Sequence, residues 1–186
     1  MTFAARVGGR DRARLFTALL LPDLVVRRLV SWQQEAFSGV ADVRPIAPEN
    51  LHITLAFLGH RPARELEAII DALRAAAAAA EPPVLTVARY RETRSVGMLA
   101  LDDDGGRATA LAEDLHGRLQ RLGVYEPERR RWVPHVTVVR FRRAPRLAPS
   151  LPDLAAFSPS EAAVYHSVLR TSGAQYEILE SVALGG

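Results

Sequence analysis

The chain has 186 residues, of which 48% are apolar, and its formal net charge is +3. This length predicts a single domain with a full core, and the modest charge excludes a general nucleic-acid coat. The sequence contains no cysteine and no lysine, which excludes disulfides, thiolate nucleophiles, lysyl-adenylates, Schiff bases and P-loop lysines.

The predicted elements begin after an N-terminal tail. Residues 1–13 are rich in Gly and Arg and lack the apolar stretch of a signal peptide. We interpret them as a flexible tail, followed by one bilobal domain over residues 14–186. No uncharged apolar run is long enough to span a membrane. These features predict a cytoplasmic protein, and a monomer is expected because no long apolar helix face is left over.

Strands and helices are expected along the rest of the chain. Asp23 is expected to cap the first helix, Gly59 to close the third strand and Gly123 to end the third helix. The last two strands are expected to form a hairpin around Ser172. Strands are predicted at 14–21, 43–46, 51–58, 84–90, 96–101, 132–141, 161–169 and 174–184, and helices at 23–37, 61–80 and 108–122.

This order of elements predicts an α+β fold with two pseudo-symmetric lobes. Each lobe is expected to hold an antiparallel sheet with flanking helices, and an active cleft is expected between the lobes.

Two of the predicted strands carry the same motif. His52-Ile53-Thr54-Leu55 returns 83 residues later as His135-Val136-Thr137-Val138. Because side chains at i and i+2 of a strand face the same side, each copy presents one imidazole beside one hydroxyl. Two copies across a cleft form a set suited to acid–base attack on a phosphate ester. The alternative is that these are buried strand residues with satisfied hydrogen bonds, and the matching context of the two copies argues against it.

Five further residues are candidates for contact with RNA or with a base. Aromatic rings stack on bases, and arginines attract the phosphate backbone. Each of the five also has an ordinary interpretation as core or as solvated surface. They are Phe57, Arg130, Arg131, Trp132 and His166. The two other histidines, His60 and His116, are expected to be exposed to solvent.

A metal site is an alternative use for paired histidines. Zinc sites normally take three or four protein ligands, often with a thiolate or carboxylate among them. The sequence contains neither His-x-His nor His-Glu-x-x-His. We therefore expect no metal and no cofactor.

Four segments in order give the chain a specific resemblance to a known family. They are RLFTALLLP (14–22), PENLHITLAFLG (48–59), RWVPHVTVVR (131–140) and VYHSVLRTSGAQYEIL (164–179). The chain resembles the LigT-like RNA 2′,3′-cyclic phosphodiesterases, historically called 2′-5′ RNA ligases, within the two-histidine (HxTx) phosphoesterases. Many relatives carry a Trp or another large residue in the strand that matches residues 98–101, and this chain does not.

The resemblance implies a bilobal fold and metal-independent hydrolysis of a 2′,3′-cyclic phosphate to a 2′-phosphomonoester. The implied substrate is RNA with such an end, or a cyclic nucleotide. His52 and His135 would be the catalytic pair, and Thr54, Thr137 and Arg140 would bind the substrate phosphate.

The chemistry requires one neutral and one protonated histidine, which predicts a bell-shaped pH profile. We expect His52 to protonate the leaving sugar oxygen and His135 to take the proton from water. Two alternatives stay open. One is the reverse reaction, which would join RNA ends through a 2′-5′ linkage. The other is a non-catalytic RNA- or nucleotide-binding module, although binding alone needs no acid–base pair.

Overall fold

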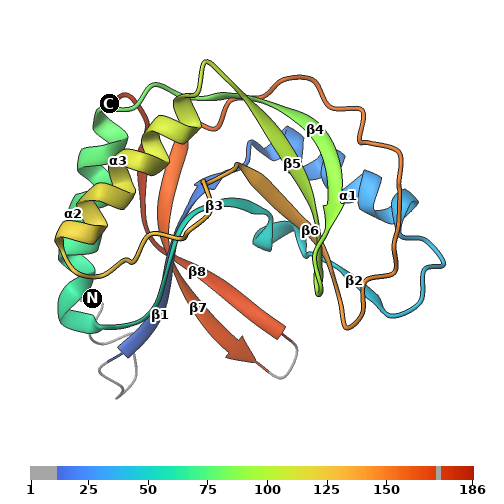
Figure 1. The fold of residues 1–186 in the computed structure, drawn as a ribbon, viewed down its shortest axis with the longest axis horizontal. Helices are drawn as coiled ribbons and strands as arrows, with labels where there is room; N and C mark the ends of the chain where they lie inside the picture. The colour runs from blue at the N-terminus through green and yellow to red at the C-terminus, as the bar shows by residue number, and fades with distance from the viewer. Residues whose placement is uncertain (1–11, 171–172) are drawn as a thin grey trace.

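The computed structural model describes residues 12–170 and 173–186 (Figure 1). In these ranges the chain forms eight strands, three α-helices and two 3₁₀ turns. The strands are β1 (Arg12–Leu20), β2 (Val43–Pro45), β3 (His52–Pro62), β4 (Val84–Glu92), β5 (Val96–Asp104), β6 (His135–Phe141), β7 (Glu161–Arg170) and β8 (Gly173–Ala183). The helices are α1 (Asp23–Ala36), α2 (Leu66–Ala78) and α3 (Arg107–Arg121), and the 3₁₀ turns are Pro48–Asn50 and Ala63–Glu65.

Two predicted features lie wholly or partly outside the described residues. Of the expected flexible tail, only Arg12 and Ala13 are described, and both already belong to β1. β7 and β8 pair as expected, but Ser172, around which the hairpin was predicted to turn, is not among the described residues.

The strands form one antiparallel sheet in the order β4-β5-β6-β3-β1-β7-β8, with β2 paired to β6. The join between β3 and β6 is narrow, because it rests on one registered pair, Ile53 with Val136. This join divides the sheet into two halves. One half contains β3, β1, β7 and β8, and the other contains β2, β6, β5 and β4. The predicted two-lobed α+β fold is confirmed. Figure 1 shows the strong curl of the sheet and the projecting hairpin of β7 and β8.

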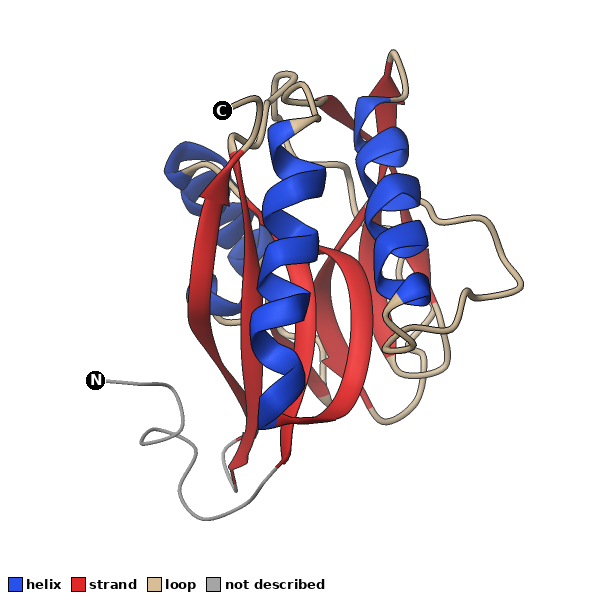
Figure 2. Cartoon of the chain, turned by 90° about the vertical axis from the view of Figure 1, so that its left-hand side faces the viewer, coloured by secondary structure: helices blue, strands red, loops and turns tan. Residues whose placement is uncertain are grey.

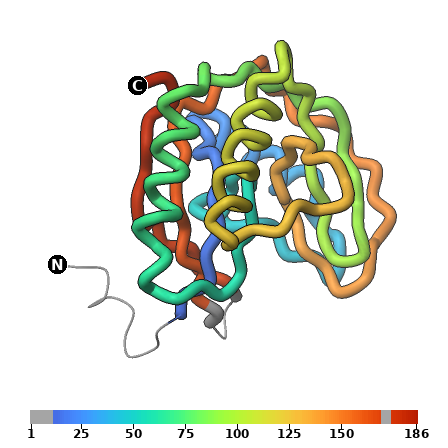
Figure 3. The backbone as a smooth tube through the Cα atoms, turned by 60° about the vertical axis from the view of Figure 1, so that its left-hand side comes forward, coloured from blue at the N-terminus to red at the C-terminus, as the bar shows by residue number. Residues whose placement is uncertain are grey.

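The helices cover the sheet with apolar stripes. α2 and α3 lie side by side (Figures 2 and 3), and α1 packs against β6 in the other half. Leu111, Leu115 and Leu119 of α3 are at most 2% exposed, as their helical spacing predicts. Burying each such leucine contributes about 1.5–3 kcal/mol to folding. In the described ranges, no helix combines the length and the apolar character needed to cross a membrane.

Several strand ends differ from the prediction. β4 runs on to Glu92 and β5 to Asp104, beyond the predicted ends at residues 90 and 101. Two other boundaries differ for local reasons. β3 does not end at Gly59 but runs on to Pro62, because Gly59 takes a φ of +68° beside a register shift in the pairing with β1. β6 begins at His135 rather than Trp132. The preceding Pro134 has no backbone N–H to donate to a neighbouring strand.

Two helix starts also differ from the prediction. The N-cap position of α1 belongs to Pro22, and no side chain caps this end. Asp23 lies instead in the first turn, where a negative charge favours the helix dipole. α2 begins at Leu66 and not at Arg61, because β3 and a 3₁₀ turn occupy the residues before it.

Candidate active site

The two motifs lie side by side at the centre of the sheet, where β3 and β6 begin. Their second residues, Ile53 and Val136, pair in antiparallel register. Because the two strands are antiparallel, this pair turns the histidine end of each motif toward the threonine end of the other. The four apolar motif residues are at most 1% exposed. The two imidazoles and two hydroxyls consequently share the opposite face, as the motif pattern predicts.

Both histidines are held in the same way. His52 Nδ1 lies 2.8 Å from the carbonyl oxygen of Asn50, and His135 Nδ1 lies 2.9 Å from that of Val133. A carbonyl oxygen only accepts, so Nδ1 carries the hydrogen and Nε2 is left to gain or lose a proton. His52 Nε2 lies 3.1 Å from Thr54 Oγ1, and this hydroxyl donates to Nε2 while the imidazole is neutral.

Aromatic rings surround His52 on its own half of the sheet. The ring centroids of Phe16, Tyr176 and Tyr165 lie 5.0, 5.4 and 5.9 Å from that of His52. Phe16 also stacks on Tyr165 at 4.8 Å with an interplanar angle of 3°. The sequence analysis did not identify these rings as part of the site, because β1, β7 and β8 bring them to the motif from distant segments.

Burial among these rings disfavours the charged form of the imidazole. Burial is the largest of the causes that together lower the pKa of His52 from 6.5 to about 4, and the charges of His135 and Arg140 contribute to the same decrease. The hydrogen bond to the Asn50 carbonyl opposes this change. His52 is therefore neutral at pH 7 in the free protein.

A groove of about 520 Å³ opens beside the two motifs. Its lining contains five of the predicted residues: His52, Phe57, Thr54, Thr137 and Arg140. His135 is not among the lining residues, although its charge acts on His52. Among the described residues, no group of three or more His, Asp or Glu side chains is placed to hold a metal ion.

The four other predicted contacts do not line the groove. Trp132 donates its Nε1–H to the backbone oxygen of Thr54 over 3.0 Å, so it supports the first motif strand. Arg130 and Arg131 are exposed in the loop before β6. His166 is half-buried in β7 and also lies outside the lining.

A helix side chain also binds each motif strand. In both strands it donates a hydrogen bond to the backbone oxygen of the residue that follows the motif threonine. His116 of α3 donates Nε2–H to the oxygen of Leu55 over 2.7 Å, and Gln33 of α1 donates to that of Val138 over 2.6 Å. These contacts are equivalent in the two motifs. The expectation that His116 is solvated was wrong, because it bonds to β3 and stacks on the ring of Tyr125 at 4.6 Å. His60 is exposed as expected, although it lies in β3.

The groove also contains polar residues that the sequence analysis missed. Arg14 lies over the ring of Phe57, 4.9 Å from its centroid. Arg44 enters from β2, and its place could not be predicted because nothing local indicates which strand β2 joins. Ser167 lines the groove with a buried Oγ that has no hydrogen-bond partner.

Comparisons with known sequences agree with this geometry. The family model described as "2′-5′ RNA ligase superfamily" matches residues 2–174. A Thermus thermophilus protein named RNA 2′,3′-cyclic phosphodiesterase is 33% identical over 188 residues, covering 93% of this chain and 91% of that protein. An Escherichia coli protein of the same name is 41% identical over 56 residues, 30% of this chain and 31% of that protein.

Solved structures share the fold over almost the whole chain. A crystal structure from T. thermophilus gives a TM-score of 0.81 at 28% identity, covering 93% of this chain and 98% of that one. E. coli LigT complexed with phosphate gives 0.76 at 26% identity, covering 95% and 100%.

A two-lobed sheet whose two His-x-Thr strands meet beside one groove defines the class of two-histidine phosphoesterases. Within this class, the chain belongs to the 2′-5′ RNA ligase superfamily and is LigT-like.

Proposed function

We propose that the protein is a metal-independent RNA 2′,3′-cyclic phosphodiesterase. It opens the 2′,3′-cyclic phosphate of an RNA end or a cyclic nucleotide to a 2′-phosphomonoester. One observation carries the proposal: two imidazoles anchored through Nδ1 share a face with two threonine hydroxyls where the motif strands meet. The names of the relatives support the same reaction.

The reaction needs two proton transfers and groups that stabilise the negative charge on the phosphate oxygens. Water attacks phosphorus, the bond from phosphorus to O3′ breaks, and O3′ leaves with a proton. Thr54, Thr137 and Arg140 line the groove and hold the non-bridging oxygens, where their donors stabilise the charge of the transition state. The Thr54 hydroxyl turns from His52 Nε2 to the phosphate when substrate binds, which frees the Nε2 lone pair to accept a proton. The two Nε2 atoms take one proton from the water and give one to O3′.

The roles of the two histidines are assigned from the protonation of His52 before substrate binds. A neutral imidazole accepts a proton at once, and His52 is neutral at pH 7 because its pKa is lowered to about 4. We assign His52 as the base and His135 as the acid. This reverses the assignment expected from the sequence.

Turnover of a short oligonucleotide with a 2′,3′-cyclic phosphate end, measured in EDTA, tests the proposed activity. The expected product is the 2′-phosphate, and His52→Ala and His135→Ala each lower kcat by about 10²–10⁴. His60→Ala is the control, since His60 is exposed on the same strand and outside the groove. Full activity in either catalytic variant would contradict the paired mechanism. Tight binding without any wild-type turnover would identify a binding module instead.

A substrate with sulfur in place of O3′ tests the roles separately. A thiolate leaves without a general acid, so the variant that lacks the acid regains rate while the variant that lacks the base does not. We expect recovery for His135→Ala only. Recovery for His52→Ala only would restore the assignment expected from the sequence.

A further inference from the structure

The groove holds more positive charge than one cyclic phosphate needs. Arg14, Arg44 and Arg140 all line it, and no carboxylate is among the lining residues that the structure describes. None of the three forms an ion pair with a described residue. A cyclic phosphodiester carries a single negative charge, for which Arg140 and the two threonine hydroxyls suffice.

Two of these arginines are placed side by side. Arg44 of β2 pairs directly across from Arg140 of β6 in antiparallel register, so their side chains leave the same face of the sheet. Like charges in this relation destabilise a sheet. The arrangement becomes favourable when anions bind, because guanidinium groups bind phosphate oxygens in a bidentate manner.

The third arginine has a different setting. Arg14 is half-buried and stacks on Phe57. Arg44 is exposed, and the structure gives it neither an ion pair nor a side-chain hydrogen bond within residues 12–170 and 173–186. Arg44 is therefore the guanidinium most available to a second anion, one strand away from the arginine beside the reacting phosphate. Neighbouring strands lie about 4.8 Å apart, so an anion on Arg44 would lie next to the reacting phosphate, as the adjoining phosphodiester of the same substrate does.

We propose that Arg44 binds the phosphodiester that precedes the cyclic phosphate, and that the preferred substrates are oligoribonucleotide ends rather than mononucleotides. This inference rests on the proposed function and names its substrate class. Arg140 holds the reacting phosphate, while Arg44 holds the next phosphate along the chain.

Three substrates test the inference at low ionic strength. They are a nucleoside 2′,3′-cyclic phosphate, a dinucleotide with the same end, and that dinucleotide with an uncharged methylphosphonate linkage. For the wild type, we expect kcat/KM on the charged dinucleotide to exceed that on both others by about tenfold, the effect of one charge-assisted hydrogen bond. For Arg44→Gln, the ratio between the charged and uncharged dinucleotides falls close to one.

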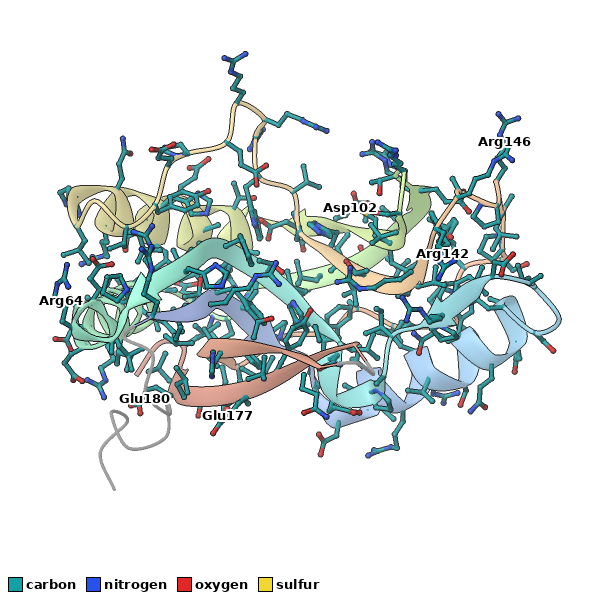
Figure 4. All side chains as sticks on the ribbon, turned by 90° about the horizontal axis from the view of Figure 1, so that it is seen from below. Arg64, Asp102, Arg142, Arg146, Glu177 and Glu180 are labelled. Carbon is teal, nitrogen blue, oxygen red and sulfur yellow. The ribbon has the colours of Figure 1, made fainter. Side chains whose placement is uncertain are left out.

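Arg142→Gln is the matched control. Arg142 follows β6, is exposed, and does not line the groove. Figure 4 shows Arg142 in the right-hand half of the view and Glu177 and Glu180 in the left-hand half. This variant should keep the wild-type ratio between the two dinucleotides.

The outcomes separate this inference from the function on which it rests. Turnover of all three substrates with no preference for the charged linkage would overturn the role of Arg44 and leave the activity standing. A preference that persists in Arg44→Gln would do the same. No turnover of any substrate would overturn both proposals.

Discussion

The lowered pKa of His52 predicts a specific dependence of stability on pH. In the unfolded chain this imidazole titrates near 6.5, and in the folded protein near 4. Between these values the unfolded state binds more protons than the folded state. The free energy of unfolding therefore falls as pH falls from 6.5 towards 4. The full effect of about 2.5 pKa units corresponds to about 3 kcal/mol, of which about 2 kcal/mol is lost between pH 7 and pH 5.

His52→Gln removes this titration and keeps a polar side chain of similar length. Urea unfolding at pH 7 and pH 5 gives the loss of stability for each protein. We expect the wild type to lose about 2 kcal/mol more than His52→Gln over this interval. His60→Gln is the control, because His60 is exposed on the same strand, and it should lose as much as the wild type. An equal loss in the wild type and in His52→Gln would refute the buried, neutral His52.

Three further predictions concern the groups around the motifs. His116→Leu leaves the oxygen of Leu55 unpaired, so it should lower the free energy of unfolding in urea by about 1–3 kcal/mol and also lower kcat. His116→Gln keeps a donor and should recover most of the stability and most of kcat. Equal defects in the two variants would exclude the hydrogen bond as the cause. Phe16→Ala opens the aromatic surroundings of His52 to water and should raise the pKa of His52 towards 6.5, which an NMR titration measures. An unchanged pKa would show that these rings do not cause the burial of His52. Thr137→Val removes a hydroxyl from the groove and should lower kcat/KM about tenfold with little change in the melting temperature, while a normal kcat/KM would remove Thr137 from phosphate binding.

The sequence predicted those parts of the protein that depend on local pattern. The alternation in residues 52–55 and 135–138 placed two imidazoles and two hydroxyls on one face, and the register of Ile53 with Val136 agrees with it. The leucine spacing of residues 111–119 predicted the buried face of α3. In these segments the spacing of apolar and polar side chains is enough to predict which face of the strand or helix is buried.

The sequence could not predict which distant segments meet at the site. Arg44 reaches the groove only because β2 pairs with β6. His116 was expected in solvent because its helix shows one apolar stripe, yet a polar side chain off that stripe meets a carbonyl of β3. Such contacts depend on the path of the chain between elements. The spacing of residues within one strand or helix does not indicate which other elements that strand or helix will contact.

The repeated motif by itself would give two equivalent histidines, and acid–base catalysis needs two different ones. The backbone holds both alike, through a carbonyl two residues before each histidine. The difference comes from the two halves of the sheet. β1, β7 and β8 bring three aromatic rings to His52, while no described aromatic ring contact involves His135. β1 and the hairpin of β7 and β8 thus give His52 surroundings that His135 lacks, and in the mechanism we propose this difference separates the base from the acid.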